Sequence, residues 1–196
     1  MKYDFEVGKE NFKLSSDKEI VQQSMVAQDL NYVNNVLKKD MSGKILDLGS
    51  GDGFFQTKVS DAISVSANKD DISQGKLAGF NMVFADAHNL PFKKGTFDYV
   101  WARQCFEHFV SPYVALKEVH RVLKKDGIAI IIVPIPLPVQ ISASTHLYVL
   151  DAFQWANLFN KTGFKALDGI QTHRVKDKEV TEDEYIFILK REERPK

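Results

Sequence analysis

The sequence predicts an α/β fold in which a mostly parallel, doubly wound sheet carries an antiparallel hairpin at one edge. Three observations lead to this fold class. Short apolar runs alternate with segments of helical periodicity from Lys44 onward, and such alternation is typical of right-handed strand-helix-strand crossovers. The run Ile128–Val133 is rich in β-branched residues, as expected of a strand buried on both faces. Two later apolar runs lie too close together for a crossover helix, so we expect them to pair as antiparallel strands.

The individual elements follow from apolar spacing, caps and turns. A first helix is predicted at Ser16–Lys39, where apolar residues recur at roughly helical spacing. The strands of the parallel part are expected at Ile45–Leu48, Ile63–Ala67, Met82–Ala85, Phe97–Ala102 and Ile128–Val133, with a helix beginning near Phe54. Further helices are expected at Pro112–Leu123, before a turn at Asp126 and Gly127, and at Asp151–Asn160. The edge hairpin is expected to pair Phe164–Thr172 with Tyr185–Leu189.

The composition is that of one ordinary globular domain. A chain of 196 residues fits a single domain, with residues 1–40 as a helical segment or lid and residues 41–196 as the core. The 26 basic and 26 acidic residues balance, which gives no support for a nucleic-acid binder that works by phosphate neutralisation. A single cysteine fits a reducing compartment, and no apolar run is long enough to span a bilayer. We therefore expect a cytoplasmic protein without a membrane partner.

The segment Ile45–Gly53, with the sequence ILDLGSGDG, predicts a ligand site at the end of the first strand. Glycines adopt positive φ and let a ligand approach the backbone, and ligands of doubly wound folds bind at the carboxyl ends of the strands. The spacing Gly-x-Gly-x-Gly differs from the dinucleotide pattern Gly-x-Gly-x-x-Gly, and no Lys-Ser or Lys-Thr follows to make a P-loop. Asp47 and Asp52 would repel a pyrophosphate, whereas they suit a ligand that carries an ammonium and a sulfonium group.

Several blocks after the glycine turn share their order with a known family. These are ADA at 85–87, LPF at 90–92, FDYV at 97–100, EH at 107–108, LKEVHRVLKKDG at 116–127 and TGF at 162–164. Together with the first block, they make the chain from about Lys44 to Gly163 resemble the class I S-adenosylmethionine-dependent methyltransferases of the type 11 kind. The resemblance implies a Rossmann-like sheet of strand order 3-2-1-4-5-7-6 in a single methyltransferase domain, residues 1–196. It also implies S-adenosylmethionine as the methyl donor and S-adenosylhomocysteine as the product.

The resemblance assigns roles to residues of the candidate cofactor site. The carboxylate of Asp47 and the backbone of the glycine turn would hold the methionine moiety, and Asp86 with Ala87 would recognise the adenine. A carboxylate accepts a hydrogen bond from an exocyclic amine, and a small neighbour leaves room for the ring. The residues of the glycine turn in this assignment are Gly49, Ser50, Gly51 and Gly53.

One position departs from the family pattern. Asn68 stands where the family usually ends its second strand in an acidic residue that accepts both ribose hydroxyls. An amide oxygen lacks the charge assistance of a carboxylate. We therefore expect weaker cofactor binding, a shift of the role to Asp70, or an alignment that slips by a residue or two. Arg103 is expected to pair with a carboxylate of the cofactor or the substrate, with an ordinary surface arginine as the alternative.

Methyl transfer from a sulfonium requires the protein mainly to position the reacting groups, because a base is needed only when the acceptor binds in its protonated form. His146, in the loop after the fifth strand, is the candidate base. His108 is expected to be a structural hydrogen-bonding residue, and Cys105 a small buried apolar group. The aromatic residues expected on the core face of the last helix are Phe153, Trp155 and Phe159.

The segment after the fourth strand bears on the acceptor. Nucleic-acid and protein-amide N-methyltransferases often carry Asn or Asp followed by Pro-Pro-Tyr there, and this chain has no such tetrad. Adenine bases and glutamine side chains are therefore disfavoured as acceptors. The sequence predicts a methyltransferase that acts on a small molecule, without a bound metal. The alternative is a methyltransferase-like partner or scaffold protein that binds the cofactor but is catalytically weak or inactive.

Overall fold

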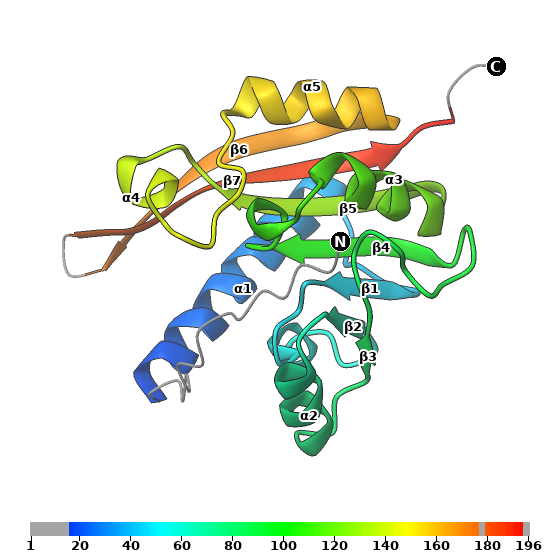
Figure 1. Ribbon diagram of the computed structural model, residues 1–196, viewed down its shortest axis with the longest axis horizontal. Helices are drawn as coiled ribbons and strands as arrows, with labels where there is room; N and C mark the ends of the chain where they lie inside the picture. Colours follow the sequence, from blue (N-terminus) through cyan, green and yellow to red (C-terminus); the bar gives the residue numbers. More distant parts are fainter. Residues whose placement is uncertain (1–15, 177–178, 194–196) are drawn as a thin grey trace, which may run out of the picture.

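The computed structural model describes residues 16–176 and 179–193, which form one seven-stranded sheet of order β3-β2-β1-β4-β5-β7-β6 (Figure 1). Strands β1 to β5 run parallel to one another, whereas β7 pairs antiparallel with both β5 and β6. The predicted fold class and strand order are confirmed. The first 15 residues of the segment 1–40, which was expected to be a helical segment or lid, lie outside the described residues. Within those residues, no helix combines the length and the apolar character needed to cross a membrane.

The elements follow the predicted order with changes at their bounds. The helices and strands are α1 (Ser16–Leu37), β1 (Ile45–Leu48), η1 (Phe54–Thr57), β2 (Ile63–Ser66), α2 (Lys69–Leu77), β3 (Met82–Phe84), β4 (Phe97–Arg103), η2 (Phe106–His108), α3 (Pro112–Val122), β5 (Leu123–Pro134), α4 (Pro138–Ile141), α5 (Ala152–Thr162), β6 (Phe164–Lys176) and β7 (Glu179–Arg191). Strand β5 starts earlier than expected because it pairs with β4 again beyond an irregularity. Asp126, in that irregularity, has a φ of 61°, so the predicted turn survives as a break within the strand.

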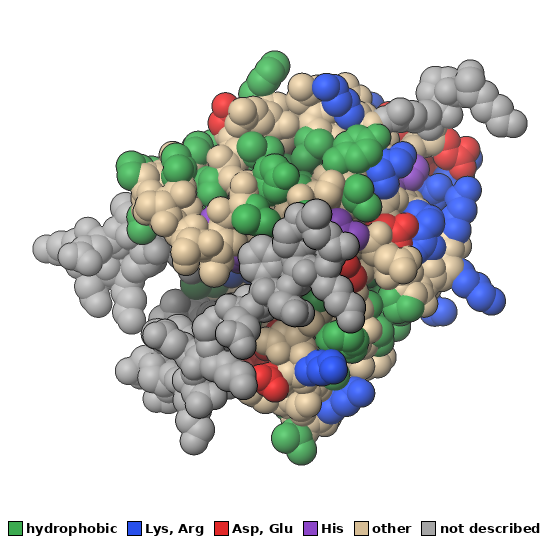
Figure 2. All heavy atoms as spheres, in the orientation of Figure 1, with side chains coloured by type: hydrophobic (Ala, Val, Ile, Leu, Met, Phe, Trp, Pro, Cys, Tyr) green, Lys and Arg blue, Asp and Glu red, His purple; other side chains and the backbone are tan. Residues whose placement is uncertain are grey.

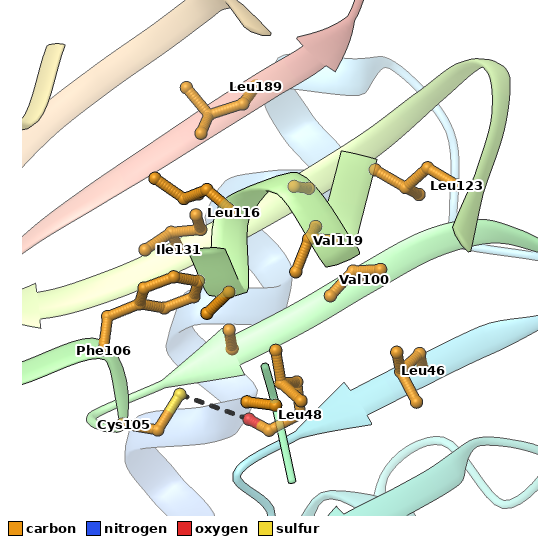
Figure 3. Packing of buried hydrophobic residues seen from close by; sticks show 14 of the residues in the cluster. Leu46, Leu48, Val100, Cys105, Phe106, Leu116, Val119, Leu123, Ile131 and Leu189 are labelled. Carbon is orange, nitrogen blue, oxygen red and sulfur yellow. Dashed lines mark hydrogen bonds between the residues drawn. The ribbon is translucent and has the colours of Figure 1, made fainter. Parts of the chain in front are cut away.

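Two apolar layers cover the two faces of the sheet. On one face, α3 packs on β4 and β5 while α5 packs on β6 and β7, and Figure 3 shows Leu116 and Val119 of α3 above Val100 and Ile131. On the other face, Val26 and Val33 of α1 join a second cluster with alternate residues of the same strands. Burial on both faces explains why β5 reads as a continuous apolar run.

Apolar side chains also remain on the surface of the helices that cover the first face. Figure 2 shows hydrophobic side chains gathered over the part of the molecule that carries these helices. The prediction that Phe153 faces the core is wrong, because its exposed fraction is 80%, whereas Trp155 and Phe159 are buried as expected. Phe153 is the second residue of α5 and lies two positions before Trp155, so a helix turns it away from the sheet. The large exposed apolar residues of α3, α4 and α5 are Tyr113, Val114, Val139, Ile141 and Phe153.

The helix expected near Phe54 is also wrong in kind, because η1 is a single 3-10 turn of four residues. Residues 49–62 connect β1 to β2, and the glycine turn takes up the first five of them. Phe55 stacks on Trp101 of β4 with ring centroids 4.8 Å apart, which fixes this short connection against the sheet. The amide donors of a long helix are therefore not part of the candidate site. Conversely, α2 was not expected, and its first turn is capped by Asn68.

The inward and outward positions of α3 give a matched test of the packing. Val119 is fully buried and Val114 is 40% exposed. Val119→Ala should lower the free energy of unfolding by roughly 1–3 kcal/mol, because it removes buried methyl groups and leaves a cavity. Val114→Ala, the same change on the same helix, should alter it by less than about 0.5 kcal/mol. Urea denaturation measures both values, and equal losses would contradict the assigned faces.

Candidate functional site

The glycine turn after β1 takes a backbone path that side chains would obstruct. Gly49, Gly51 and Gly53 have φ values of 69°, 55° and 89°, in the left-handed region that glycine adopts without strain. A Cβ on Gly49 would collide with the side chain of Cys105, whereas a Cβ on Gly51 would have no atom within 4 Å. The turn is thus packed tightly at its start and open at its middle, where a ligand can approach the backbone.

Asp47 lies beside this turn with its carboxylate buried in the sheet. Its exposed fraction is 3%, and Ser64 Oγ of β2 donates a 2.8 Å hydrogen bond to its Oδ2. Gln56 of η1 holds the Ser64 hydroxyl in place through a 2.8 Å bond. Burial raises the pKa of Asp47 to about 7, although the Ser64 bond lowers it, and the nearby Asp52 adds to the increase. A cationic ligand beside the carboxylate would lower the pKa of Asp47 again.

A cavity of about 180 Å³ joins Asp47 to four other parts of the fold. Its walls come from the glycine turn, from η1, from the carboxyl end of β4 and from α1. This volume is below the 300–1,000 Å³ that is usual for a drug-sized ligand, so the cavity holds only part of a nucleoside-sized molecule. The residues that line it are Val26, Asp47, Gly49, Ser50, Gly51, Phe54, Phe55, Trp101, Arg103 and Gln104.

Arg103 lines the cavity while it ties three elements together. Its guanidinium donates to Asp29 of α1 at 3.2 Å and to Glu184 of β7 at 2.7 Å, and both of these carboxylates are buried. Gln104 donates to the same Glu184 oxygen at 2.6 Å. Two protein carboxylates thus already surround the group that the sequence analysis assigned to a ligand carboxylate. That assignment stays a prediction.

Asn68 occupies a helix cap instead of the strand end. Strand β2 stops at Ser66, and the Asn68 side chain accepts a 2.8 Å hydrogen bond from the backbone N–H of Asp70 at the start of α2. The Ser66 hydroxyl donates to Asp71 at 2.8 Å. The polar residue that ends the strand is therefore Ser66, two positions before the residue singled out from the sequence. The roles of Asn68 and Asp70 toward a ribose stay predictions.

Asp86 and Ala87 lie beyond β3, at the same edge of the sheet. Asp86 is exposed, and its Oδ1 accepts from the His88 backbone N–H at 2.9 Å and lies 2.6 Å from His88 Nδ1. Partial burial would raise the pKa of Asp86, but these bonds from His88 leave it below the ordinary value. Ala87 is buried in the core. Asp86 therefore keeps a charged carboxylate at the rim, as contact with an adenine amine would require.

The residues expected near the acceptor gather after β4. Cys105 is buried, as predicted, and its thiol donates to the Leu48 carbonyl at 3.3 Å (Figure 3). His108 Nδ1 donates to the Thr145 carbonyl at 2.9 Å, which confirms the structural hydrogen bond expected of it. His146 Nδ1 donates to the Gln140 carbonyl at 2.9 Å, and the two imidazole centroids are 5.0 Å apart. The sequence analysis did not foresee this histidine pair.

Glu107 is the residue of this region whose importance the sequence analysis missed. It is fully buried, and burial raises its pKa to about 8. A hydrogen bond with its own backbone and the charge of Arg103 lower this pKa, whereas the charge of Glu184 raises it further. The charges of Glu107 and Asp47 both help to raise the pKa of the Cys105 thiol. Glu107 therefore lies near the cavity that Asp47 lines. The Glu-His pair at 107–108 was noted only as part of a family block, and no spacing pattern marked the carboxylate as buried.

The sheet order, the antiparallel edge and the glycine turn beside a buried aspartate define the class I methyltransferase fold. Residues 46–131 match the family model described as a methyltransferase domain. Over these residues the chain is similar to methyltransferases, and its fold is the one that class I S-adenosylmethionine-dependent methyltransferases share.

Two of the curated proteins that are similar to this chain are methyltransferases by name. Over 111 residues, the chain is 30% identical to the uncharacterized methyltransferase YcgJ of Bacillus subtilis, which covers 51% of this chain and 44% of YcgJ. It is 26% identical over 135 residues to a chloroplastic 2-methyl-6-phytyl-1,4-hydroquinone methyltransferase of Oryza sativa, covering 62% of this chain and 41% of that protein. These matches thus span less than half the length of the two relatives.

The solved structures add support for the fold. A Thermotoga maritima S-adenosylmethionine-dependent methyltransferase, described as a possible histamine N-methyltransferase, superposes with a TM-score of 0.70 at 20% identity. The superposition covers 90% of this chain and 96% of that chain. The core that surrounds the candidate site is therefore shared with this structure over nearly its whole length.

The burial of Asp47 predicts a pH-dependent cost to stability. Between the ordinary pKa of 3.8 and about 7, the unfolded chain has lost the proton that the folded protein still binds. The free energy of unfolding should therefore fall as the pH rises through this window. Asp47→Asn removes this dependence, so the variant should gain stability relative to the natural protein as the pH approaches 7.

Urea denaturation of both proteins without ligand at several pH values measures the effect. Asp61→Asn is the matched control, because Asp61 is exposed in the turn before β2. The stability of this control is expected to follow that of the natural protein. A stability difference between Asp47→Asn and the natural protein that does not change with pH would contradict the raised pKa.

Proposed function

We propose that this chain transfers a methyl group from S-adenosylmethionine to a small-molecule acceptor. The observation that carries the proposal is the buried carboxylate of Asp47, which faces a cavity lined by a left-handed glycine turn. A buried carboxylate without a cationic partner is costly, and the α-ammonium group of the methionine moiety supplies such a partner. The donor set thus fits this cofactor, whereas a pyrophosphate would meet the negative charges of Asp47 and Asp52.

The remainder of the cofactor fits the rim of the cavity. Because about 180 Å³ accommodates only part of the molecule, the adenosine would extend along the carboxyl ends of β2 and β3. Asn68 would contact the ribose there, and Asp86 with Ala87 would contact the adenine. The backbone from Gly49 to Gly53 would follow the methionine moiety, and Arg103 would attract its carboxylate. When bound, the cofactor supplies an activated methyl group on a sulfonium.

The protein's own residues would then position the acceptor and exclude water. The wall formed by Trp101 and Phe55 is apolar and stacked, and a dry wall favours displacement at a sulfonium carbon. His146 lies in a loop that backbone bonds from Leu147 and Tyr148 hold to the Glu107 carbonyl. With Nδ1 donating to Gln140, Nε2 of neutral His146 is the nitrogen that can accept a proton from an acceptor.

A small-molecule acceptor is supported by the names of two similar proteins. One methylates a substituted hydroquinone by its name, and the other is described as a possible histamine N-methyltransferase. The absence of an Asn/Asp-Pro-Pro-Tyr tetrad after β4 supports the same choice. We propose a single domain over residues 1–196 that acts in the cytoplasm.

A second candidate function is cofactor binding without methyl transfer. The cap made by Asn68 and the lack of an acidic residue at the end of β2 favour a protein that binds S-adenosylmethionine weakly and serves as a partner or scaffold. Release of S-adenosylhomocysteine in the presence of a panel of small phenols, amines and thiols separates the two. Product release above the acceptor-free rate supports the enzyme, and cofactor binding without release for any acceptor supports the partner protein.

Asp47→Asn tests the cofactor site directly. Asparagine still accepts the Ser64 hydrogen bond but carries no charge, so the association constant for S-adenosylmethionine should fall by about 10- to 100-fold. Calorimetric titration of the folded variant measures this constant. The exposed Asp61→Asn variant should bind like the natural protein. Unchanged affinity of Asp47→Asn would overturn the assignment of the methionine pocket.

Asn68→Asp tests the proposed ribose contact through an expected gain in cofactor affinity. Aspartate is as good a helix cap as asparagine, so α2 should remain intact. A carboxylate accepts hydroxyl hydrogen bonds with about twice the strength of a neutral acceptor, so the affinity for S-adenosylmethionine should rise several-fold. Calorimetry again measures the constant. If this variant binds no more tightly than the natural protein, the side chain at position 68 does not contact the ribose.

A further inference from the structure

The residues after β4 contain a cluster that the methyl-transfer chemistry does not itself require. Glu107 of η2, His108 of the same turn and His146 of the loop before α5 each offer one ligand atom, and these atoms all lie within 4.8 Å of one another. His108 Nε2 is 3.8 Å from Glu107 Oε1. The cluster joins two segments that are almost forty positions apart in the sequence.

The carboxylate of Glu107 is the first sign that the cluster is built for a ligand. Glu107 has an exposed fraction of 0%, and no other residue that the structure describes makes a hydrogen bond to either of its carboxylate oxygens. Buried polar groups are nearly always satisfied, and a buried charge is paired or bound to a metal. The nearby Arg103 guanidinium is already engaged by Asp29 and Glu184. An additional cation would satisfy Glu107.

The two imidazoles are oriented in the manner of metal ligands. Each donates its Nδ1 proton to a backbone carbonyl, His108 to Thr145 and His146 to Gln140. A carbonyl oxygen only accepts, so the neutral rings carry their lone pairs on Nε2. This is the arrangement by which metal-binding histidines fix their tautomer and ring orientation.

The backbone holds the two segments in register. The Glu107 carbonyl accepts hydrogen bonds from Leu147 N–H at 2.7 Å and Tyr148 N–H at 3.1 Å. His146 is the residue next to this pair of bonds, so its position relative to Glu107 is set by main-chain contacts. Four-coordinate ligands at about 2.0–2.1 Å from a metal lie roughly 3.4 Å apart, so these ligand atoms, which all lie within 4.8 Å of one another, would move closer together around a bound metal.

We propose that Glu107, His108 and His146 bind a divalent transition metal of the zinc class beside the acceptor end of the cavity. Two imidazole nitrogens and one carboxylate suit Zn²⁺, Fe²⁺ or Co²⁺, whereas Mg²⁺ and Ca²⁺ prefer all-oxygen sites. Three protein ligands leave open positions, so the metal would accept an oxygen or nitrogen atom of the acceptor. The placement beside the acceptor rests on the proposed function, but the metal site itself does not.

This site changes the role of His146 and the expectation of a protein without metal. Nε2 of His146 cannot both ligate a metal and accept a proton. With the site filled, the metal would orient the acceptor and lower the pKa of its donor atom, and His146 would act as a ligand.

Calorimetric titration of the untagged, metal-free full chain with Zn²⁺ tests the proposal. We expect one Zn²⁺ per chain, and Co²⁺ as a probe should show the visible absorption of a nitrogen-containing site. Glu107→Gln, which keeps the shape of the side chain, and His146→Ala should each lower the Zn²⁺ association constant by about 100-fold or more. Circular dichroism shows that the variants remain folded.

His120→Ala is the matched control. His120 lies on α3 and contacts the Glu192 carbonyl, outside the cluster, so this variant should bind Zn²⁺ like the natural protein. No stoichiometric Zn²⁺ binding by the natural protein, or unchanged binding by both Glu107→Gln and His146→Ala, would overturn the metal site. Titration of the metal-free protein with S-adenosylmethionine runs in parallel. Zn²⁺ binding without cofactor binding supports the metal site and removes the proposed function, and the reverse removes only the metal site.

Discussion

Burial of the Asp47 carboxylate at the carboxyl end of β1 is the constraint on which the candidate site depends. The strand is central in the sheet, and its end opens onto the cavity beside the glycine turn. Cys105, which follows the neighbouring strand β4, packs against that turn, and Ser64 with Gln56 supports the carboxylate from behind. A folded protein that raises the pKa of this carboxyl to about 7 holds a charge that a cationic ligand stabilises better than solvent can.

The second support of the site is the ion pair network that closes it from above. Arg103, at the end of β4, binds a buried carboxylate on α1 and another on β7. Helix α1 is thereby fixed over the cavity, to which it contributes Val26. Replacing one member of such a buried network costs more than the network adds, because the partner is left unpaired. The antiparallel strand β7 therefore serves the site as well as the sheet.

The fold could be predicted because the alternation of apolar runs and helical periods is a local signal with a strong physical cause. The bounds of β1 to β4 were right to within one residue, whereas β5 and β7 begin five and six residues earlier than expected. Short elements were harder. A 3-10 turn such as η1 has no period to detect, and Asn68 is favoured both at strand ends and at helix caps, where only the tertiary structure decides. Glu107 was missed because its neighbours in space are set by the Leu147 and Tyr148 backbone bonds, which no sequence spacing records.

The buried carboxylate of Asp47 is proposed to bind the ammonium group of the cofactor. The most direct measurement is the proton release when S-adenosylmethionine binds, obtained by calorimetry in buffers of different ionisation enthalpy. At about pH 6, one unit below the raised pKa, the carboxyl is mostly protonated while an α-ammonium of pKa about 7.7–8.0 is charged. Binding should then release close to one proton per cofactor, and Asp47→Asn should release none. Binding without net proton transfer in the natural protein would contradict the account.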